Sequence, residues 1–257
     1  MTALLRSLLL YLSVQHACSF SIPRPLKGVI FDMDGTLIKS VIDFPDMRRR
    51  IYEVASEDLG IDVREGDVLA LAKSLSVQGQ EKANSVFRDI EAKAIRDMEL
   101  NEGMLDLCEF LDKLRIPRAL LTRNVEATVE HLHKSKMHAT ARFHPAISRD
   151  TVLKGEIIRP KPFPDAIIYI CQQWGCEPSQ VVMVGDSLHD DIVAANRAGS
   201  ISVHLTTIHD NDSGTASASS DDEQVPDIVI QSLRELQEIL QEVDVVTRKK
   251  TAVVDLL

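Results

Sequence analysis

The strongest constraint on this chain comes from residues 28–37, where an apolar run ends in two carboxylates, Asp32 and Asp34. Strand-forming side chains precede Asp32, and the abrupt change in polarity there predicts a buried strand that ends in a turn at Gly35. Because alternate residues of a strand point to opposite faces, the two carboxylates converge only if the chain bends, which glycine permits. Converging carboxylates need a cation or a shared proton, and Mg²⁺ suits a few carboxylate oxygens. The stretch therefore predicts either a metal site or an ordinary Asp-Gly turn after a strand.

The sequence Phe-Asp-Met-Asp-Gly-Thr-Leu at residues 31–37 resembles the first motif of the haloacid dehalogenase-like (HAD) hydrolase superfamily. The resemblance implies that Asp32 is the nucleophile and that Asp34 is the general acid and base. The presence of Asp34 also argues against the halide-removing branch of the superfamily, which lacks this second acid. Three further segments resemble the remaining motifs in the expected order, so the resemblance covers about residues 27–240.

Thr122 directly follows a predicted strand at residues 119–121. A hydroxyl group and backbone N–H groups at a strand end can hold phosphate oxygens, although a helix N-terminus or an ordinary turn would explain the same residue. The second motif of the family has Thr or Ser at this place, which makes Thr122 a candidate for catalysis and substrate binding. We expect Asn124 to cap the following helix or to support the loop. Arg123 and Asn124 are further candidates for substrate binding, and Arg123 adds a charge whose role is not assigned.

Lys161 lies among three prolines in residues 159–165. Prolines fix the backbone, so the ammonium group would lose little conformational freedom when it binds an anion. A Lys followed by Pro before a helix resembles the third motif of the family. The resemblance implies that Lys161 neutralises the nucleophile and the phosphoryl oxygens during catalysis and contacts the substrate. A solvated surface lysine is the alternative.

The segment that resembles the fourth motif is acidic and spans residues 184–191. Asp186 directly follows an apolar strand pattern, so we expect it at the same sheet edge as the carboxylates of the first motif, where it would bind the metal. The last ligand stays open between Asp190 and Asp191, and the usual spacing in the family favours Asp191. The predicted magnesium ligands are therefore Asp32, Asp34, Asp186 and Asp191.

Length and composition limit the remaining possibilities. The 257 residues suffice for one α/β core with a small insertion or for two modest domains, and 44% hydrophobic residues allow a packed core. A net charge of −10 opposes non-specific attraction to nucleic-acid phosphates and to anionic membrane surfaces. The four cysteines show no Cys-x-x-Cys spacing, so neither a zinc site nor a disulfide framework is indicated.

Short apolar strands alternate with amphipathic helices along most of the chain. This pattern predicts an α/β fold with a doubly wound, mainly parallel sheet whose ligand crevice lies at the carboxyl ends of the strands. Between the first two strands, helical spacing recurs over residues 45–59, 67–75 and 81–98, which predicts a small α-helical cap. The resemblance implies a Rossmann-like HAD core and a cap that covers the active site. The predicted parts are the core at residues 23–40 and 101–243 and the cap at residues 41–100.

The composition changes at both ends of the chain and once within it. Residues 1–22 combine a short apolar run with small residues, which predicts a cleaved targeting presequence and no stable membrane association after its removal. A resemblance of residues 17–23 to the signal-to-transit junction of algal plastid proteins points to a plastid, and the secretory pathway is the alternative. Residues 210–224 are acidic and rich in serine, which predicts a mobile surface loop, and residues 244–257 are expected to form a flexible tail.

Together these motifs predict a magnesium-dependent phosphomonoester hydrolase that acts on a small phosphorylated metabolite through an aspartyl-phosphate intermediate. Two alternatives stay open: a sugar phosphomutase of the same superfamily, and an inactive protein that binds a phosphorylated ligand. Nucleic acid is not expected as a partner. The cap would choose the substrate. Because Arg48, Arg49 and Arg50 cover different directions of one predicted helix, at most one or two of them could face the site.

Overall fold

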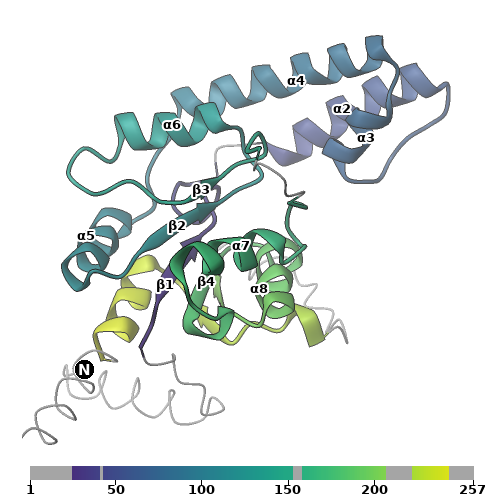
Figure 1. The fold of residues 1–257 in the computed structure, drawn as a ribbon. Coiled ribbons are helices and arrows are strands. Elements are labelled where there is room, and N and C mark those ends of the chain that lie inside the picture. Colours follow the sequence, from purple (N-terminus) through teal and green to yellow (C-terminus); the bar gives the residue numbers. More distant parts are fainter. Residues whose placement is uncertain (1–24, 41–42, 153–157, 207–221, 243–257) are drawn as a thin grey trace, which may run out of the picture.

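The computed structural model describes residues 25–40, 43–152, 158–206 and 222–242. These residues form an α/β core and a group of helices that projects from one end of it (Figure 1). The predicted presequence at residues 1–22 and the predicted tail at residues 244–257 lie outside the described part of the chain.

The core contains a six-stranded sheet in which every neighbouring pair of strands is parallel. Its strands are β1 (Gly28–Phe31), β2 (Arg118–Leu121), β3 (Ala146–Ile147), β4 (Val181–Gly185), β5 (Ile201–Leu205) and β6 (Ile228–Ile230). The strand order is β3-β2-β1-β4-β5-β6, so the order reverses between β1 and β4. Ligand crevices form at such a reversal, outside the carboxyl ends of the strands. The predicted doubly wound α/β fold is confirmed.

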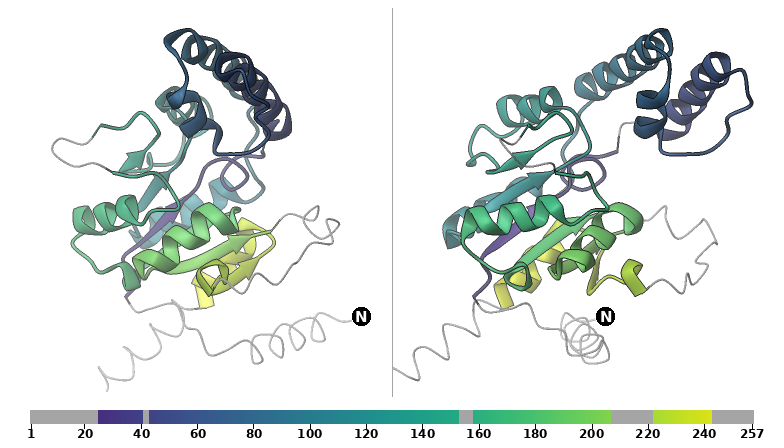
Figure 2. Two further views of the ribbon diagram at one scale, coloured as in Figure 1. Left: turned by 90° about the vertical axis from the view of Figure 1, so that its right-hand side faces the viewer. Right: turned by 45° about the vertical axis from the view of Figure 1, so that its right-hand side comes forward.

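Helices cover both faces of this sheet (Figure 2). The helices are α5 (Met104–Leu114), α6 (Glu126–Ser135), α7 (Asp165–Trp174), α8 (Val193–Ala198) and a last helix that begins at residue 233. Along β1, Val29 and Phe31 pack on the face that carries α5, α6 and the last helix. Ile30 points to the other face, which carries α7 and α8. Burial on both faces explains why the strands read as continuous apolar runs.

Three helices between β1 and β2 form the cap: α2 (Phe44–Leu59), α3 (Val68–Ser74) and α4 (Val77–Arg96). They lie within residues 41–100, the segment predicted as an insertion. Their apolar faces pack against one another in a cluster separate from the two clusters of the core, and its fully buried members are Ile51, Ala55 and Ala83. The cap therefore has its own small core, and it lies above the end of the sheet at which β1 ends (Figure 2).

The last cap helix starts earlier than the sequence analysis placed it. α4 begins at Val77 rather than at Glu81. The hydroxyl of Ser76 accepts a hydrogen bond from the Gly79 N–H at 3.2 Å, so Ser76 caps the helix at this earlier point. A glycine in the first turn obscured this start in the sequence, because glycine is a poor helix former in helix interiors.

The predicted acidic loop at residues 210–224 is described only at its end. Asp222–Gln224 form a short 3₁₀ helix. The Arg197 guanidinium of α8 donates to the Glu223 carboxylate at 2.6 Å, and the Asn196 side-chain amide donates to the Glu223 carbonyl at 2.7 Å. These contacts hold residues 222–224 against α8, and the rest of the predicted loop, residues 210–221, lies outside the described residues.

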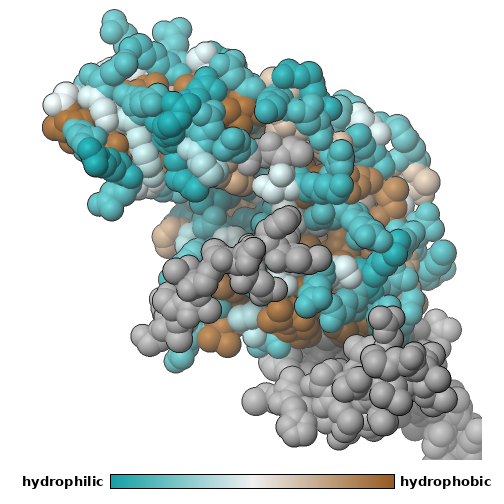
Figure 3. Space-filling model, turned by 180° about the vertical axis from the view of Figure 1, so that it is seen from behind, coloured by the Kyte–Doolittle hydropathy of each residue, from teal (hydrophilic) through white to brown (hydrophobic). Residues whose placement is uncertain are grey.

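The surface of the described residues is mainly polar on the face seen in Figure 3, where hydrophobic side chains occur in small groups. Among the helices that the structure describes, none is both long and apolar enough to cross a bilayer.

Candidate active site

The turn after β1 brings Asp32 and Asp34 to the carboxyl edge of the sheet. The Asp32 N–H donates to the Val184 carbonyl of β4 at 2.9 Å, so the end of β1 stays tied to the neighbouring strand. The chain then bends at Gly35, where φ is +81°, a conformation that other residues rarely adopt. A Cβ atom at this position would lie 2.1 Å from the Asp186 carboxylate. Gly35 therefore permits both the bend and the close approach of Asp186.

Lys161 lies between two of the carboxylates and is only 4% exposed. Its Nζ donates to Asp32 Oδ1 at 2.5 Å and to Asp191 Oδ1 at 2.6 Å. Burial by itself lowers the pKa of Lys161, but the charges of Asp191 and Asp32 outweigh burial and raise this pKa above its ordinary value. Burial raises the pKa of Asp32 well above its usual range, and Lys161 offsets part of that rise. The structure thus places the lysine beside the predicted nucleophile.

The two adjacent aspartates after β4, Asp190 and Asp191, contact different partners. Asp191 is buried and accepts a hydrogen bond from the Ser187 N–H at 3.1 Å. Its carboxyl group packs against Gly185, where a Cβ would lie 2.2 Å from the Asp191 carboxyl carbon. Asp190 instead accepts a hydrogen bond from Arg123 Nη1 at 2.9 Å. Asp191 therefore lies beside Lys161, and Asp190 lies beside Arg123.

Three carboxylates form a group that could hold a metal ion, because ligand atoms of Asp32, Asp186 and Asp191 all lie within 4.8 Å of one another. Burial and the charge of Asp191 raise the pKa of Asp186 to about 7. Lys161 supplies one positive charge against three carboxylates, so a divalent cation would offset the remaining repulsion. All the ligand atoms are oxygens, which is the donor set that Mg²⁺ prefers.

The Asp34 carboxylate is not a member of this group of three, although Asp34 was predicted as a fourth ligand. The bend directs its side chain toward the loop after β2, where its Oδ2 accepts a hydrogen bond from Asn124 Nδ2 at 3.0 Å. Its Oδ1 is buried and has no hydrogen-bond partner among the residues that the structure describes. Burial raises the pKa of Asp34, and the bond from Asn124 lowers it in part. A buried carboxyl group with a raised pKa and a free oxygen suits proton transfer.

The loop after β2 holds Thr122 and Asn124 in fixed positions. Thr122 is buried, and its hydroxyl accepts a hydrogen bond from the Asn124 N–H at 3.0 Å. The Asn124 Oδ1 accepts from the Val125 N–H at 2.8 Å and from the Thr128 hydroxyl at 3.0 Å. Asn124 therefore supports the loop, as expected, and contacts Thr128 in the first turn of α6, whose N-cap residue is Val125. It also orients Asp34, which sequence reasoning missed.

Arg123, which had no assigned role, connects the cap to the core. Its guanidinium donates to Asp190 in the core and to Asp67, the residue that caps the N-terminus of α3. Its side chain is partly buried, with 29% exposed. Burial alone lowers the pKa of Arg123, but the two carboxylates raise this pKa overall. The guanidinium thus ties a cap helix to the loop that carries Asp191.

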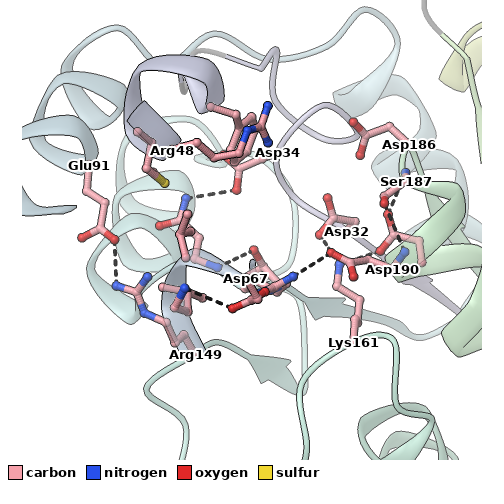
Figure 4. A pocket seen from close by; sticks show the side chains of 18 of the residues that line it. Asp32, Asp34, Arg48, Asp67, Glu91, Arg149, Lys161, Asp186, Ser187 and Asp190 are labelled. Carbon is pink, nitrogen blue, oxygen red and sulfur yellow. Dashed lines mark hydrogen bonds and ion pairs between the residues drawn. The ribbon is translucent and has the colours of Figure 1, made fainter. Parts of the chain in front are cut away.

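Cap and core together enclose a pocket of about 490 Å³ that contains all the predicted site residues. Figure 4 shows side chains of the pocket and places Lys161 and Asp186 on the core side, with Glu91 and Arg48 on the cap side. A second bridge joins the two parts, since Arg149 Nη2 donates to Glu91 Oε1 at 2.7 Å. No sequence pattern marked Arg149, Glu91 or Asp67 as site residues, because they come from the cap and from the loop after β3, far apart along the chain.

The described residues thus combine a Rossmann-like α/β core with a helical cap above the carboxyl edge of its parallel sheet, where the nucleophile candidate lies. A family model described as haloacid dehalogenase-like hydrolase matches residues 26–199, and the chain belongs to this family. It is 35% identical to a haloacid dehalogenase-like hydrolase domain-containing protein of Arabidopsis thaliana, over 94% of this chain and 97% of the relative. It is 28% identical to phosphoglycolate phosphatase 1 of Pseudomonas aeruginosa, over 81% of this chain and 77% of the relative.

Solved structures share the fold. A predicted phosphoglycolate phosphatase from Haemophilus somnus superposes with a TM-score of 0.58 and 20% sequence identity, over 84% of this chain and 98% of that chain. At this identity the likeness supports the fold alone. It agrees with the capped α/β architecture described above.

Replacing Asp191 with Asn is expected to abolish stabilisation by Mg²⁺, whereas Asp190→Asn is expected to preserve it. Asp191 belongs to the group of three carboxylates, and Asp190 pairs with Arg123. Saturating Mg²⁺, at about 100 times its Kd, would stabilise the unsubstituted protein by about 2.7 kcal/mol and raise its Tm by about 5–10 °C. Thermal melts with Mg²⁺ and with chelator, compared within each variant, measure this rise. An equal rise in both variants would contradict the assignment of Asp191.

Proposed function

We propose that the protein is a magnesium-dependent phosphomonoesterase that hydrolyses a small phosphorylated metabolite through an aspartyl-phosphate intermediate. The observation that carries the proposal is the position of Lys161, whose Nζ contacts Asp32 and Asp191 while Asp34 lies in the same pocket. Phosphatases among the relatives, such as the phosphoglycolate phosphatase of Pseudomonas aeruginosa, support the same reaction class.

Asp32 acts as the nucleophile, and Asp34 transfers a proton in each of the two chemical steps. An Asp32 carboxylate oxygen attacks phosphorus and forms the aspartyl phosphate, while the bond from phosphorus to the leaving oxygen breaks. Asp34, whose pKa is raised by burial, gives its proton to the leaving alcohol. It then takes a proton from the water that attacks the aspartyl phosphate, which releases inorganic phosphate and restores Asp32. The hydrogen bond from Asn124 keeps Asp34 in position for both transfers.

The remaining groups bind and orient the phosphoryl oxygens. The Lys161 ammonium offsets their negative charge, and the Thr122 hydroxyl with the neighbouring amides fixes their direction. Mg²⁺ held by Asp32, Asp186 and Asp191, and by Asp34 if the predicted fourth ligand joins them, would add positive charge at the same oxygens. The cap bridges through Arg123 and Arg149 would keep bulk water out.

Phosphate release from a panel of phosphorylated metabolites tests this function. We expect release by the full chain in the presence of Mg²⁺, concentrated on one or a few small substrates, and at least a 100-fold loss in chelator because the metal contributes several kcal/mol to such reactions. Full activity in chelator would contradict the metal requirement. Isomerised sugar phosphate without free phosphate would indicate a phosphomutase, and metal-dependent ligand binding without turnover would indicate a binding protein.

A further inference from the structure

The part of the pocket that faces away from the reacting carboxylates is built by the cap. Phe44, Met47, Val68 and Leu69 contribute apolar side chains to its lining. Because these residues come from α2 and α3, this wall would contact the alcohol part of a substrate whose phosphoryl group lies at Asp32. Charged groups that line the pocket near this wall would therefore select among these alcohols.

Most charged side chains of the pocket outside the group at Lys161 already have partners. Arg149 pairs with Glu91 at 2.7 Å. Arg123 pairs with Asp190 at 2.9 Å and also with Asp67. Each of these guanidinium groups is thus compensated by a carboxylate, and neither needs a ligand to balance its charge.

Arg48 on α2 differs from these residues. It lines the pocket, yet within the described residues no hydrogen bond or ion pair of its side chain is found. Figure 4 shows Arg48 on the cap side of the pocket, above the reaction centre. It is therefore the one pocket cation outside the reaction centre, among the residues that the structure describes, without a carboxylate partner.

The two neighbouring arginines have other partners, because successive residues on a helix point about 100° apart. Arg49 pairs with Glu53 at 2.8 Å and with Asp46 along the same helix. Arg50 pairs with Asp89 of α4 at 3.2 Å. Neither lines the pocket. Of the three arginines, only Arg48 can meet a substrate there.

We propose that Arg48 binds a second anionic group of the substrate, so that the preferred substrates are short phosphomonoesters whose alcohol part carries a carboxylate or another phosphate. This inference rests on the proposed phosphatase function. A guanidinium group matches both anions through paired N–H donors. A cavity of about 490 Å³ that also holds the phosphoryl group leaves room for a short carbon body against the apolar cap residues. The reaction centre carries more acidic than basic groups, so it repels a second anion. The unpaired guanidinium of Arg48 on the opposite side of the pocket would attract that anion.

Two pairs of compounds that differ in one anionic group test the proposal. The first pair is 2-phosphoglycolate and 2-hydroxyethyl phosphate, and the second is 1,3-propanediol bisphosphate and its monophosphate. For each pair we measure the ratio of kcat/KM for the doubly anionic compound to kcat/KM for its partner. In Arg48→Ala this ratio should fall about tenfold in at least one pair, mainly through KM, because one charge-assisted contact is lost.

Arg49→Ala is the matched control, because it removes an arginine from the same helix outside the pocket and should leave both ratios unchanged. Arg48→Lys should restore part of the ratio, since it keeps the charge but loses the paired donors. If the ratio of kcat/KM values falls only in the 2-phosphoglycolate pair, the second group is a carboxylate. If it falls only in the 1,3-propanediol bisphosphate pair, the second group is a phosphate. Ratios unchanged by Arg48→Ala in both pairs would overturn the proposal, even if both compounds lost activity equally.

A binding measurement separates failure of this inference from failure of the proposed function. Titration calorimetry with Mg²⁺ measures the Kd of all four compounds for the unsubstituted protein and for Arg48→Ala. In each pair, the preference is the Kd of the compound with one anionic group divided by the Kd of the compound with two. If no compound releases phosphate but the preference for the doubly anionic ligand falls about tenfold in Arg48→Ala, the proposed function is wrong and the Arg48 site stands. A preference for the doubly anionic ligand that is the same in the unsubstituted protein and in Arg48→Ala would refute the Arg48 site, whether or not phosphate is released.

Discussion

Asp32→Asn is expected to reduce phosphate release by at least about 10⁴-fold, because the amide cannot attack phosphorus and the covalent route is lost. The substitution keeps the size of a buried side chain that accepts a bond from Lys161. Lys161 also retains Asp191, so the ammonium group keeps a charged partner. The fold should therefore remain, and steady-state phosphate release with far-ultraviolet circular dichroism measures both effects.

Detection of the covalent intermediate tests the role of Asp32 independently of the rate of phosphate release. Acid quenching during turnover, followed by mass spectrometry of peptides, should find a phosphoryl group on Asp32 in the unsubstituted protein and none in Asp32→Asn. Asp190→Asn serves as the control, since Asp190 lies outside the group of three carboxylates and pairs with Arg123. Activity of Asp32→Asn close to that of the unsubstituted protein would refute the assignment of the nucleophile.

Lys161→Met is expected to have the largest effect on stability. The ammonium group is buried and pairs with Asp32 and Asp191. Its removal leaves these carboxylates close together without their cation, which typically costs about 3–5 kcal/mol. Activity should also fall by about 10³-fold, because the charge that faces the phosphoryl oxygens is lost. Urea unfolding and phosphate release measure the two effects.

Magnesium distinguishes this electrostatic account from a simple packing defect. If repulsion among the carboxylates destabilises Lys161→Met, Mg²⁺ should restore more stability to this variant than it adds to the unsubstituted protein. Lys134→Met is a suitable control, because Lys134 is exposed and pairs with Glu130 within its helix, so its loss should change stability by less than about 1 kcal/mol. A large loss of stability that Mg²⁺ leaves unchanged would favour the packing explanation.

The sequence predicted the sheet and the place of the reacting groups because both depend on local patterns. Apolar runs alternate with helical spacing, and in a parallel sheet the carboxyl ends of neighbouring strands meet at one edge. Polar residues that directly follow such runs must therefore lie near one another. The structure brings Asp32 and Asp186, which follow β1 and β4, together in this way.

The residues themselves left the choice between Asp190 and Asp191 open, although the spacing in the resembled family favoured Asp191. Asp190 and Asp191 have the same chemistry, and only the helical geometry of residues 188–192 turns one toward Lys161 and the other toward Arg123. The direction of the Asp34 side chain was likewise not predicted: its carboxylate accepts a hydrogen bond from Asn124, and its role as a metal ligand stays a prediction. Side-chain direction depends on a bend of the chain, which an alternating pattern does not specify.

The sequence by itself thus determined the α/β core, the helical insertion and the set of chemical groups at the edge of the sheet. Only the tertiary structure decided how the cap meets the core. The bridges Arg123 to Asp67 and Arg149 to Glu91 join residues more than fifty positions apart. Such pairs have no local signal, because their distance depends on how the cap packs above the sheet. That packing also selected Arg48 from a run of three arginines, since one direction of α2 faces the pocket.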